Sequence, residues 1–183
     1  MNGWRRQGRG AKLKLIGMFD QQEAALLRVL VGQVKELLNE RAADVPVDEL
    51  AELTGISSGH SSPPDDPVLA RLLPDFHRED AELASMLRTV REPELIAAKS
   101  EAASVVLATC PPDGGKAELT VEQADSWLAA LNDVRLALGT TLGVTEEMPD
   151  EPVGDESAAA HLGVYQWLTF VQDALVQTRA TAL

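Results

Sequence analysis

Cysteine and aromatic residues are scarce in this sequence, and long hydrophobic runs are missing. The single cysteine, Cys110, excludes a disulfide within one chain and agrees with a reducing compartment. Apolar runs reach only a few residues, against the roughly 20 that a membrane-spanning helix needs. No apolar segment follows the basic residues near the start, as a secretion signal would require. We therefore expect a soluble, cytoplasmic protein with no membrane contact.

Acidic residues are absent from the first 16 positions, where basic residues give a local charge of +5. The whole chain carries −13, so the remaining residues carry −18. An acidic body repels a phosphate backbone, and direct reading of duplex DNA is therefore not expected. Residues 1–20 are predicted to form a basic arm with a short strand. Whether this arm touches nucleic acid stays open beside the simpler interpretation of a solvated terminus.

Hydrophobic residues make up 45% of the 183 positions, enough to bury a proper core. The apolar spacing from residue 21 onward is mostly helical. We predict one domain over residues 1–183, a mostly α bundle of about six helices with a short N-terminal β element. The predicted elements are an edge-like strand within 11–19 and helices over 21–41, 47–54, 66–73, 79–91, 92–109, 121–142 and 157–178.

Polar residues at the ends of these segments support the boundaries. Asp20 is placed to cap the helix over 21–41, and Thr120 with Gln123 forms a capping box for the helix over 121–142. Residues 110–118 are predicted to be a loop, and residues 145–157 a mobile acidic loop. The last helix is apolar almost all round, which predicts a central place in the core.

The stretch SSGHSSPPDDPVLARLLPDFHRED, residues 57–80, gathers two of the three histidines with five carboxylates. His60 and His77 lie 17 positions apart with prolines between them, whereas ligands on one helix face are three or four apart. A structural role is therefore favoured over a metal site. Asp65 or Asp66 would cap a helix opened by Pro67, and Asp75 would cap the turn after Pro74. Phe76 would anchor in the core with His77 hydrogen-bonded beside it.

Sequence signals of catalysis and of DNA reading are weak. The segment DELAELTGISSG imitates the first half of a helix-turn-helix, but the residues that follow cannot start a recognition helix. No GxSxG, P-loop or GxGxxG occurs, so we expect no enzyme activity and no cofactor. Cys110 follows a predicted helix, whose C-terminal dipole disfavours a thiolate, and Lys116 is the only cation near it in sequence. A partly buried, unreactive thiol is expected, with a redox role left open.

Arg135 falls inside the apolar stripe of the helix over 121–142. A guanidinium on a core face needs a paired carboxylate, or it must face a partner chain. An internal ion pair with Glu94, Glu101 or Asp173 is the favoured interpretation, and a polar contact in a protein interface is the alternative. The residues singled out as a partner surface or as polar parts of the core are Pro64, Asp65, Asp66, Asp75, His77, Asn132, Asp133 and Arg135.

Four long strings carry a family resemblance: TGISSGHSSPPDDPVLARLLPDFHR, REPELI, WLAALNDVRLALGTTLGV and YQWLTFVQDALVQ. They are similar to those of an actinobacterial family of domains of unknown function, the family of the oxidative-stress transcriptional regulator AosR. The similarity covers about residues 5–180. It implies a cytoplasmic regulator that contacts a sigma factor or RNA polymerase and raises genes for cysteine supply under oxidation. It supplies no catalytic residues, and a disulfide switch within the chain would need a second cysteine beside Cys110.

Two classes of function follow from these observations. A protein-binding regulator, with a protein partner or a second copy of itself, should expose an apolar patch of several hundred Å². A small-ligand sensor or an enzyme should enclose a pocket with converging polar groups, for which His60, Asp75 and His77 are the nearest candidates. The first class is favoured.

Overall fold

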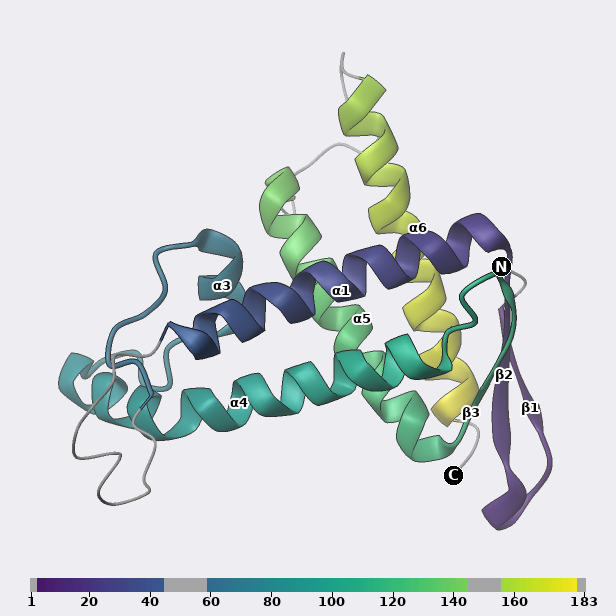
Figure 1. Cartoon of the computed structure of the whole chain (residues 1–183), viewed down its shortest axis with the longest axis horizontal. Coiled ribbons are helices and arrows are strands. Elements are labelled where there is room, and N and C mark those ends of the chain that lie inside the picture. The colour runs from purple at the N-terminus through teal and green to yellow at the C-terminus, as the bar shows by residue number, and fades with distance from the viewer. Residues whose placement is uncertain (1–2, 45–58, 145–155, 181–183) are drawn as a thin grey trace.

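The computed structural model describes residues 3–44, 59–144 and 156–180. Within these ranges the chain is mostly α-helical with one small antiparallel sheet (Figure 1), which confirms the predicted class. None of the helices there has the length and apolar character that a membrane span requires. The helix predicted over 47–54 and most of the acidic loop predicted over 145–157 lie outside the described residues.

Two antiparallel pairs of long helices make up most of the structure. In Figure 1, α1 and α4 run side by side in opposite directions, and α5 and α6 form a second pair that crosses them. The short helix α3 packs against α5. The described α-helices are α1 (Gln21–Ala43), α3 (Pro67–Leu72), α4 (Ala81–Thr109), α5 (Val121–Leu142) and α6 (Glu156–Ala180).

The predicted caps hold the starts of two of these helices. The Asp20 side chain accepts the Glu23 backbone N–H at 2.8 Å, and the Glu23 carboxylate accepts the Asp20 N–H at 2.9 Å. Thr120 and Gln123 form the same reciprocal pair at the start of α5. Both capping predictions are confirmed, because each side chain satisfies a backbone donor that the helix itself leaves free.

The break predicted between residues 91 and 92 is wrong, because α4 continues through Pro93 without interruption. A proline inside a helix removes the N–H that would bond the carbonyl four residues earlier. In this structure the Thr89 carbonyl accepts the Gly59 backbone N–H instead, at 2.9 Å. The lost helical bond is therefore replaced by one from a distant segment, which no local pattern predicts.

Three strands form an antiparallel sheet in the order β1-β2-β3, at the end of the molecule where α1 begins (Figure 1). They are β1 (Trp4–Gln7), β2 (Lys14–Phe19) and β3 (Gly115–Leu119). The strand predicted within 11–19 is confirmed as β2, but its predicted edge-like character is wrong, because β2 lies in the middle with both neighbours paired. The loop predicted over 110–118 is wrong from residue 115 onward, since β3 is defined by pairing with a strand about a hundred residues earlier.

The core is centred on α5 rather than on α6. Trp127 and Leu131 of α5 are fully buried, and this helix contacts α1, α3, α4 and α6. The central place predicted for the last helix is wrong, because α6 leaves Phe170 and Val176 about half exposed, at 51% and 46%. One stripe of α6 is buried, formed by Leu168, Val171 and Leu175.

Candidate functional site

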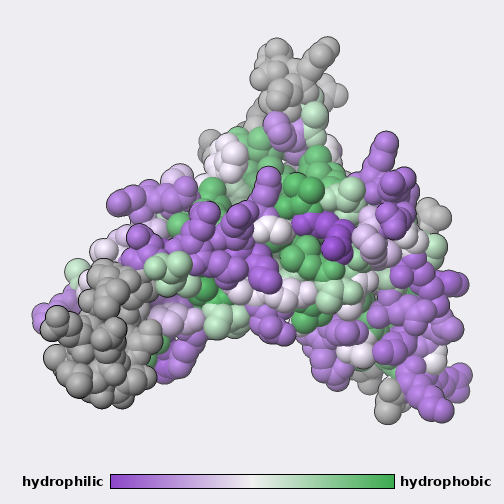
Figure 2. All heavy atoms as spheres, in the orientation of Figure 1, coloured by the Kyte–Doolittle hydropathy of each residue, from purple (hydrophilic) through white to green (hydrophobic). Residues whose placement is uncertain are grey.

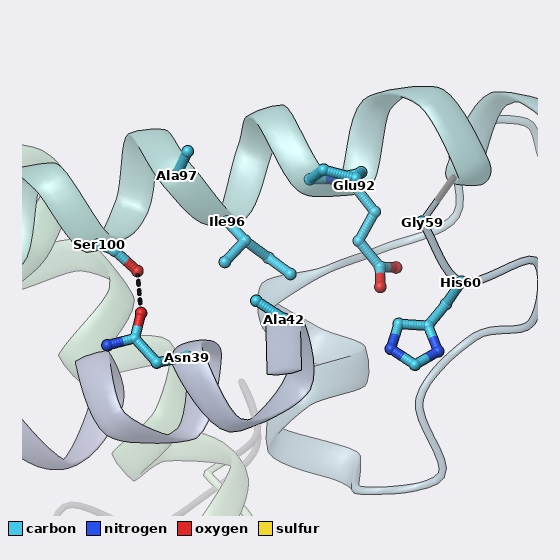
Figure 3. Close-up of a pocket in the computed structure, with 9 residues that line it drawn as sticks. Asn39, Ala42, Gly59, His60, Glu92, Ile96, Ala97 and Ser100 are labelled. Carbon is cyan, nitrogen blue, oxygen red and sulfur yellow. Dashed lines mark hydrogen bonds between the residues drawn. The ribbon is translucent and has the colours of Figure 1, made fainter. Parts of the chain in front are cut away.

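The end of the α1/α4 pair far from the sheet brings residues 59–62 next to residues 91–96. Both segments belong to the sequence strings that carry the family resemblance. Gly59 lies so close to α4 that an added Cβ would meet Pro93 Cγ at 2.8 Å and the Thr89 carbonyl oxygen at 2.9 Å. Only glycine permits this approach, and the approach supplies the hydrogen bond that Pro93 removes. Gly59 is therefore fixed against α4 at the position of Pro93, and Figure 3 shows Gly59 beside this helix.

A buried ionic network lies beside this contact. Arg88 and Glu92, one turn apart on α4, are each only 1% exposed and form an ion pair. The other Glu92 oxygen accepts Arg41 Nε of α1 at 2.9 Å. Arg41 Nη2 donates to the Ser62 carbonyl at 2.8 Å. One carboxylate thus joins both long helices and the segment after Gly59.

The same network reaches the segment between α3 and α4. Arg88 Nη2 donates to Asp75 Oδ1 at 2.6 Å, and Nη1 donates to the Leu73 carbonyl at 3.2 Å. The guanidinium also lies 5.8 Å from the centre of the Phe76 ring. Because Arg88 is held by two carboxylates and a carbonyl, its burial cost is offset by several hydrogen bonds.

A pocket of about 290 Å³ opens between α1, α4 and the Gly59 segment. Its polar walls are His60, Asn39, Ser100 and Glu92, and Figure 3 shows the Glu92 carboxylate on the same side as the His60 ring. His60 Nε2 lies 2.9 Å from the Arg41 carbonyl. A carbonyl only accepts, so Nε2 carries the hydrogen and Nδ1 is an acceptor when the ring is neutral.

The chemistry of this pocket suits binding rather than proton transfer. Both Glu92 oxygens are engaged by arginines, so the carboxylate is not free to act as a base. Asn39 Oδ1 accepts the Ser100 hydroxyl at 3.0 Å, which fixes one wall (Figure 3). In the described part of the chain, no group of three or more His, Cys, Asp or Glu side chains is placed to hold a metal ion.

The residues predicted around 57–80 take different roles. Asp66 caps α3 by accepting the Leu69 N–H at 2.8 Å, as predicted, while Asp65 is exposed. The cap predicted for Asp75 is wrong: its carboxylate binds Arg88, and Asp80 caps the next helix instead. Sequence spacing could not reveal Arg88, which approaches from 13 residues away.

Other residues of this segment have separate partners. His77 Nδ1 accepts the Asp80 N–H at 3.0 Å, which confirms a hydrogen-bonded histidine. Phe76 is half-buried rather than a core anchor, and Pro64 is buried. His60, Asp75 and His77 therefore do not share one set of hydrogen bonds, although His60 and Asp75 both lie next to the ionic network.

The favoured pairing of Arg135 is wrong. Its Nη1 donates to Gln172 Oε1 at 2.7 Å and its Nη2 lies 3.5 Å from the Tyr165 hydroxyl, with no pairing to Glu94, Glu101 or Asp173. A neutral amide and a phenol from α6 therefore stand where a carboxylate was expected.

Asp133 and Asn132 precede Arg135 but differ from each other. Asp133 is buried and accepts Lys99 Nζ of α4 at 2.5 Å. Burial raises the pKa of the Asp133 carboxyl above its ordinary value, and the bond to Lys99 opposes this shift in part. Asn132 is exposed. Asp133 is thus a polar part of the core, while Asn132 is available to solvent.

Cys110 is buried, with 1% of its surface exposed. Burial raises the pKa of its thiol to about 11, and the nearby Arg28 lowers it only in part. Arg28 donates to the Leu107 and Cys110 carbonyls at 2.6 and 2.8 Å, so Lys116 is not the nearest cation. A thiol with this pKa is almost entirely protonated near neutral pH, and its burial hinders pairing with a second chain.

Sequence reasoning missed the charged residues that α4 buries. The buried Arg88 and Glu92 and the partly buried Lys99 share one face of the helix with Ile96 and Ala103, at spacings of three and four. The charges within the apolar stripe of α4 form the same pattern as Arg135 within the stripe of α5, but this pattern is visible only when α4 is continuous through Pro93.

A second hollow, which we call the apolar groove, has a volume of about 340 Å³. Leu30 and Leu37 of α1, Val68 of α3 and Leu138 of α5 are among its walls, with Gln33 at its edge. Figure 2 shows hydrophobic residues gathered on this face where α1 crosses α5 and α6. This surface has the apolar character that partner-binding grooves share.

Comparison with known proteins identifies the class to which this helical chain belongs. Residues 1–179 match the model of the family described as a domain of unknown function, DUF2017, and the chain belongs to that family. It is 46% identical over 167 residues to the oxidative stress regulator AosR of Mycobacterium tuberculosis, across 84% of this chain and 77% of that relative. The putative oxidative stress regulator AosR of Mycobacterium leprae is 42% identical over the same shares. No solved structure matches the chain.

Proposed function

We propose that this chain is a non-enzymatic cytoplasmic regulatory protein in the response to oxidative stress and that it acts by binding a protein of the transcription machinery, a sigma factor or RNA polymerase. The role is suggested by the mycobacterial relatives, which are named oxidative stress regulators. The mode of action is suggested by the apolar groove, which is the observation that carries the proposal.

The groove supports a protein partner because of what lines it. Leu30, Leu37, Val68 and Leu138 are only partly buried although each packs against the core. Their remaining apolar area is still in contact with water, and covering it with a partner's side chains is favourable. An amphipathic helix presents apolar residues at the spacing that such a groove accepts.

The buried state of Cys110 shapes the second part of the proposal. A thiol with a pKa of about 11 and 1% exposure reacts slowly with oxidants. We therefore place the response to oxidation in the partner or in the amount of this protein, and we expect its binding to be independent of the redox state of Cys110.

The test is binding of the full chain to purified core RNA polymerase and to individually purified sigma factors, measured in reducing and in oxidising buffer. Gln33→Arg places a charge at the groove and should weaken binding by about tenfold or more. Gln166→Arg makes the same change at an exposed position of α6 that does not line the groove, and should leave affinity unchanged. Light scattering on the same samples reports whether the chain is a dimer.

Three results would contradict parts of this proposal. No saturable binding to any of these proteins would remove the transcription machinery as the partner. An equal loss of affinity in Gln33→Arg and Gln166→Arg would show that the partner does not bind at the groove. Binding only in oxidising buffer, abolished by Cys110→Ser, would show that the redox switch is Cys110 of this chain.

The pocket beside His60 supports a second candidate, a small-ligand sensor. Its volume of about 290 Å³ and its mixed walls suit a small molecule with a hydrogen-bond donor for His60 Nδ1. A thermal-shift screen of the parent and of His60→Phe would reveal a ligand that stabilises only the parent.

A further inference from the structure

Arg135 is a partly buried cation whose hydrogen-bonding capacity is poorly used. A guanidinium has five N–H donors. Only the bond to Gln172 is short, the contact to the Tyr165 hydroxyl is 3.5 Å long, and the buried Nε has no partner. The guanidinium also lies 5.3 Å from the centre of the Tyr165 ring, which holds its orientation. An unsatisfied donor of this kind calls for an explanation.

Three other buried or partly buried cations of the described chain, Arg88, Lys99 and Arg28, have better partners. Arg88 binds Glu92 and Asp75, and Lys99 binds Asp133. Arg28 has no carboxylate but donates to two carbonyls at the end of α4. Within the described residues, Arg135 has neither a carboxylate nor a pair of carbonyls.

A hollow of about 270 Å³ lies directly beside this side chain. Arg71 of α3 lines it together with Arg135 and Tyr165, and Leu136 and Val144 add apolar wall. Arg71 is exposed, so a ligand can reach its guanidinium. Two guanidinium groups around one small cavity create a site with strong preference for negative charge.

The end of α5 also borders this hollow, and its dipole carries partial negative charge. Two of its last carbonyls are already occupied, because Gly143 N–H bonds the Thr140 carbonyl at 3.2 Å and Val144 N–H bonds the Gly139 carbonyl at 2.9 Å. A half charge on satisfied carbonyls offsets only part of two full positive charges. Among the described residues that line the hollow, Arg71 and Arg135 are therefore the only ones with a full charge, and both charges are positive.

From this geometry we propose that the hollow between α3, α5 and α6 binds a small oxyanion ligand, a carboxylate or phosphate group on a short apolar body. The oxyanion accepts hydrogen bonds from Arg71 and Arg135, and the apolar body rests on Leu136 and Val144. Arginine is suited to this role because its planar fork matches both oxyanions. The site is separate from the apolar groove and from the pocket beside His60.

The test is isothermal titration of the full chain with sodium succinate and, separately, with inorganic phosphate, at constant ionic strength set by sodium chloride. One saturable site is expected for at least one probe, and the preferred probe identifies the oxyanion. Arg71→Gln should weaken binding by about tenfold, the loss expected for one charge-assisted hydrogen bond. Arg135→Lys keeps the charge but loses the fork, and should weaken binding at an unchanged melting temperature.

Arg91→Gln is the matched control, because Arg91 is an exposed arginine of α4 that does not line the hollow. It should bind as the parent does. Absence of saturable binding for both probes would overturn the proposal, as would equal affinity of the parent and Arg71→Gln.

Discussion

The two ends of the α1/α4 pair are held by opposite kinds of interaction. At the sheet end, three aromatic rings meet: Trp4 lies 5.8 Å from Phe19 and 5.3 Å from Trp127, and Phe19 lies 5.7 Å from Trp127. At the far end, Arg88, Glu92 and Arg41 form a buried ionic network. Both ends join segments that are distant in sequence. Aromatic packing and buried ion pairs can therefore each hold distant segments together.

The difference lies in what each end tolerates. The free energy gained from apolar contact is roughly proportional to the area removed from water and depends little on the direction of the contact. A buried ionic network depends on every partner, because removal of one leaves the others charged in a poor solvent. The sheet end should therefore lose stability in proportion to volume, whereas the far end should respond to charge pairing.

The largest effect should come from Trp127→Ala at the sheet end. Trp127 is fully buried, contacts both other rings and donates Nε1–H to Thr109 Oγ1 at 2.7 Å. We expect a loss of about 5 kcal/mol in the free energy of unfolding, measured by urea titration. Trp127→Phe should lose clearly less, and equal losses would argue against a volume effect.

Glu92→Ala tests the far end and should cost about 4 kcal/mol, because Arg88 remains buried without its main partner. The informative companion is the double variant Arg88→Met/Glu92→Leu, which removes both charges and keeps the volume. Its unfolding free energy should lie well above that of Glu92→Ala. A double variant as unstable as the single one would contradict the charge-pairing account.

Gly59→Ala should cost about 2 kcal/mol, since the new methyl group must displace Pro93 or break the bond to the Thr89 carbonyl. Gly32→Ala in α1 is the matched control, because nothing lies within 4 Å of its added Cβ. This change should stabilise the protein by up to about 1 kcal/mol. The predicted changes in the free energy of unfolding thus have opposite signs for Gly59→Ala and Gly32→Ala. Destabilisation by both substitutions would contradict the prediction.

The smallest effect concerns Cys110, which lies at the sheet end of α4. Its folded pKa of about 11 is above the ordinary value of 9.0, so the stabilisation from the neutral thiol is complete below pH 9 and is lost as pH rises through about 11. At pH 8 the folded protein should react with iodoacetamide about 100-fold more slowly than the urea-unfolded chain. Equal rates would show an accessible thiolate in the folded state.

Sequence reasoning succeeded where structure is local and failed where it depends on distant partners. The helix starts at Asp20, Asp66 and Thr120 were predictable, because each cap satisfies a donor three residues away. Strand β3 was not, since its pairing with β2 is a long-range contact.

The candidate site shows the same division. His60 was singled out by residue type, but the ionic network beside it was missed. Glu92 meets Arg41 from 51 positions away. For Arg135, the apolar stripe correctly identified an unusual charge, yet the neutral partners Gln172 and Tyr165 come from α6. Helical spacing therefore identifies a residue that needs a partner, but it does not identify the partner when that partner lies on another helix.

The bond between Gly59 and Thr89 also has a consequence for the order of folding. An isolated peptide covering α4 would have an unpaired carbonyl at Thr89 and would break near Pro93. The two halves of this helix can therefore form early and separately, but they become one rigid rod only when the segment at Gly59 docks. Joining of the halves is then a late step that requires loop closure over about 30 residues, and amide exchange at Gly59 would report it.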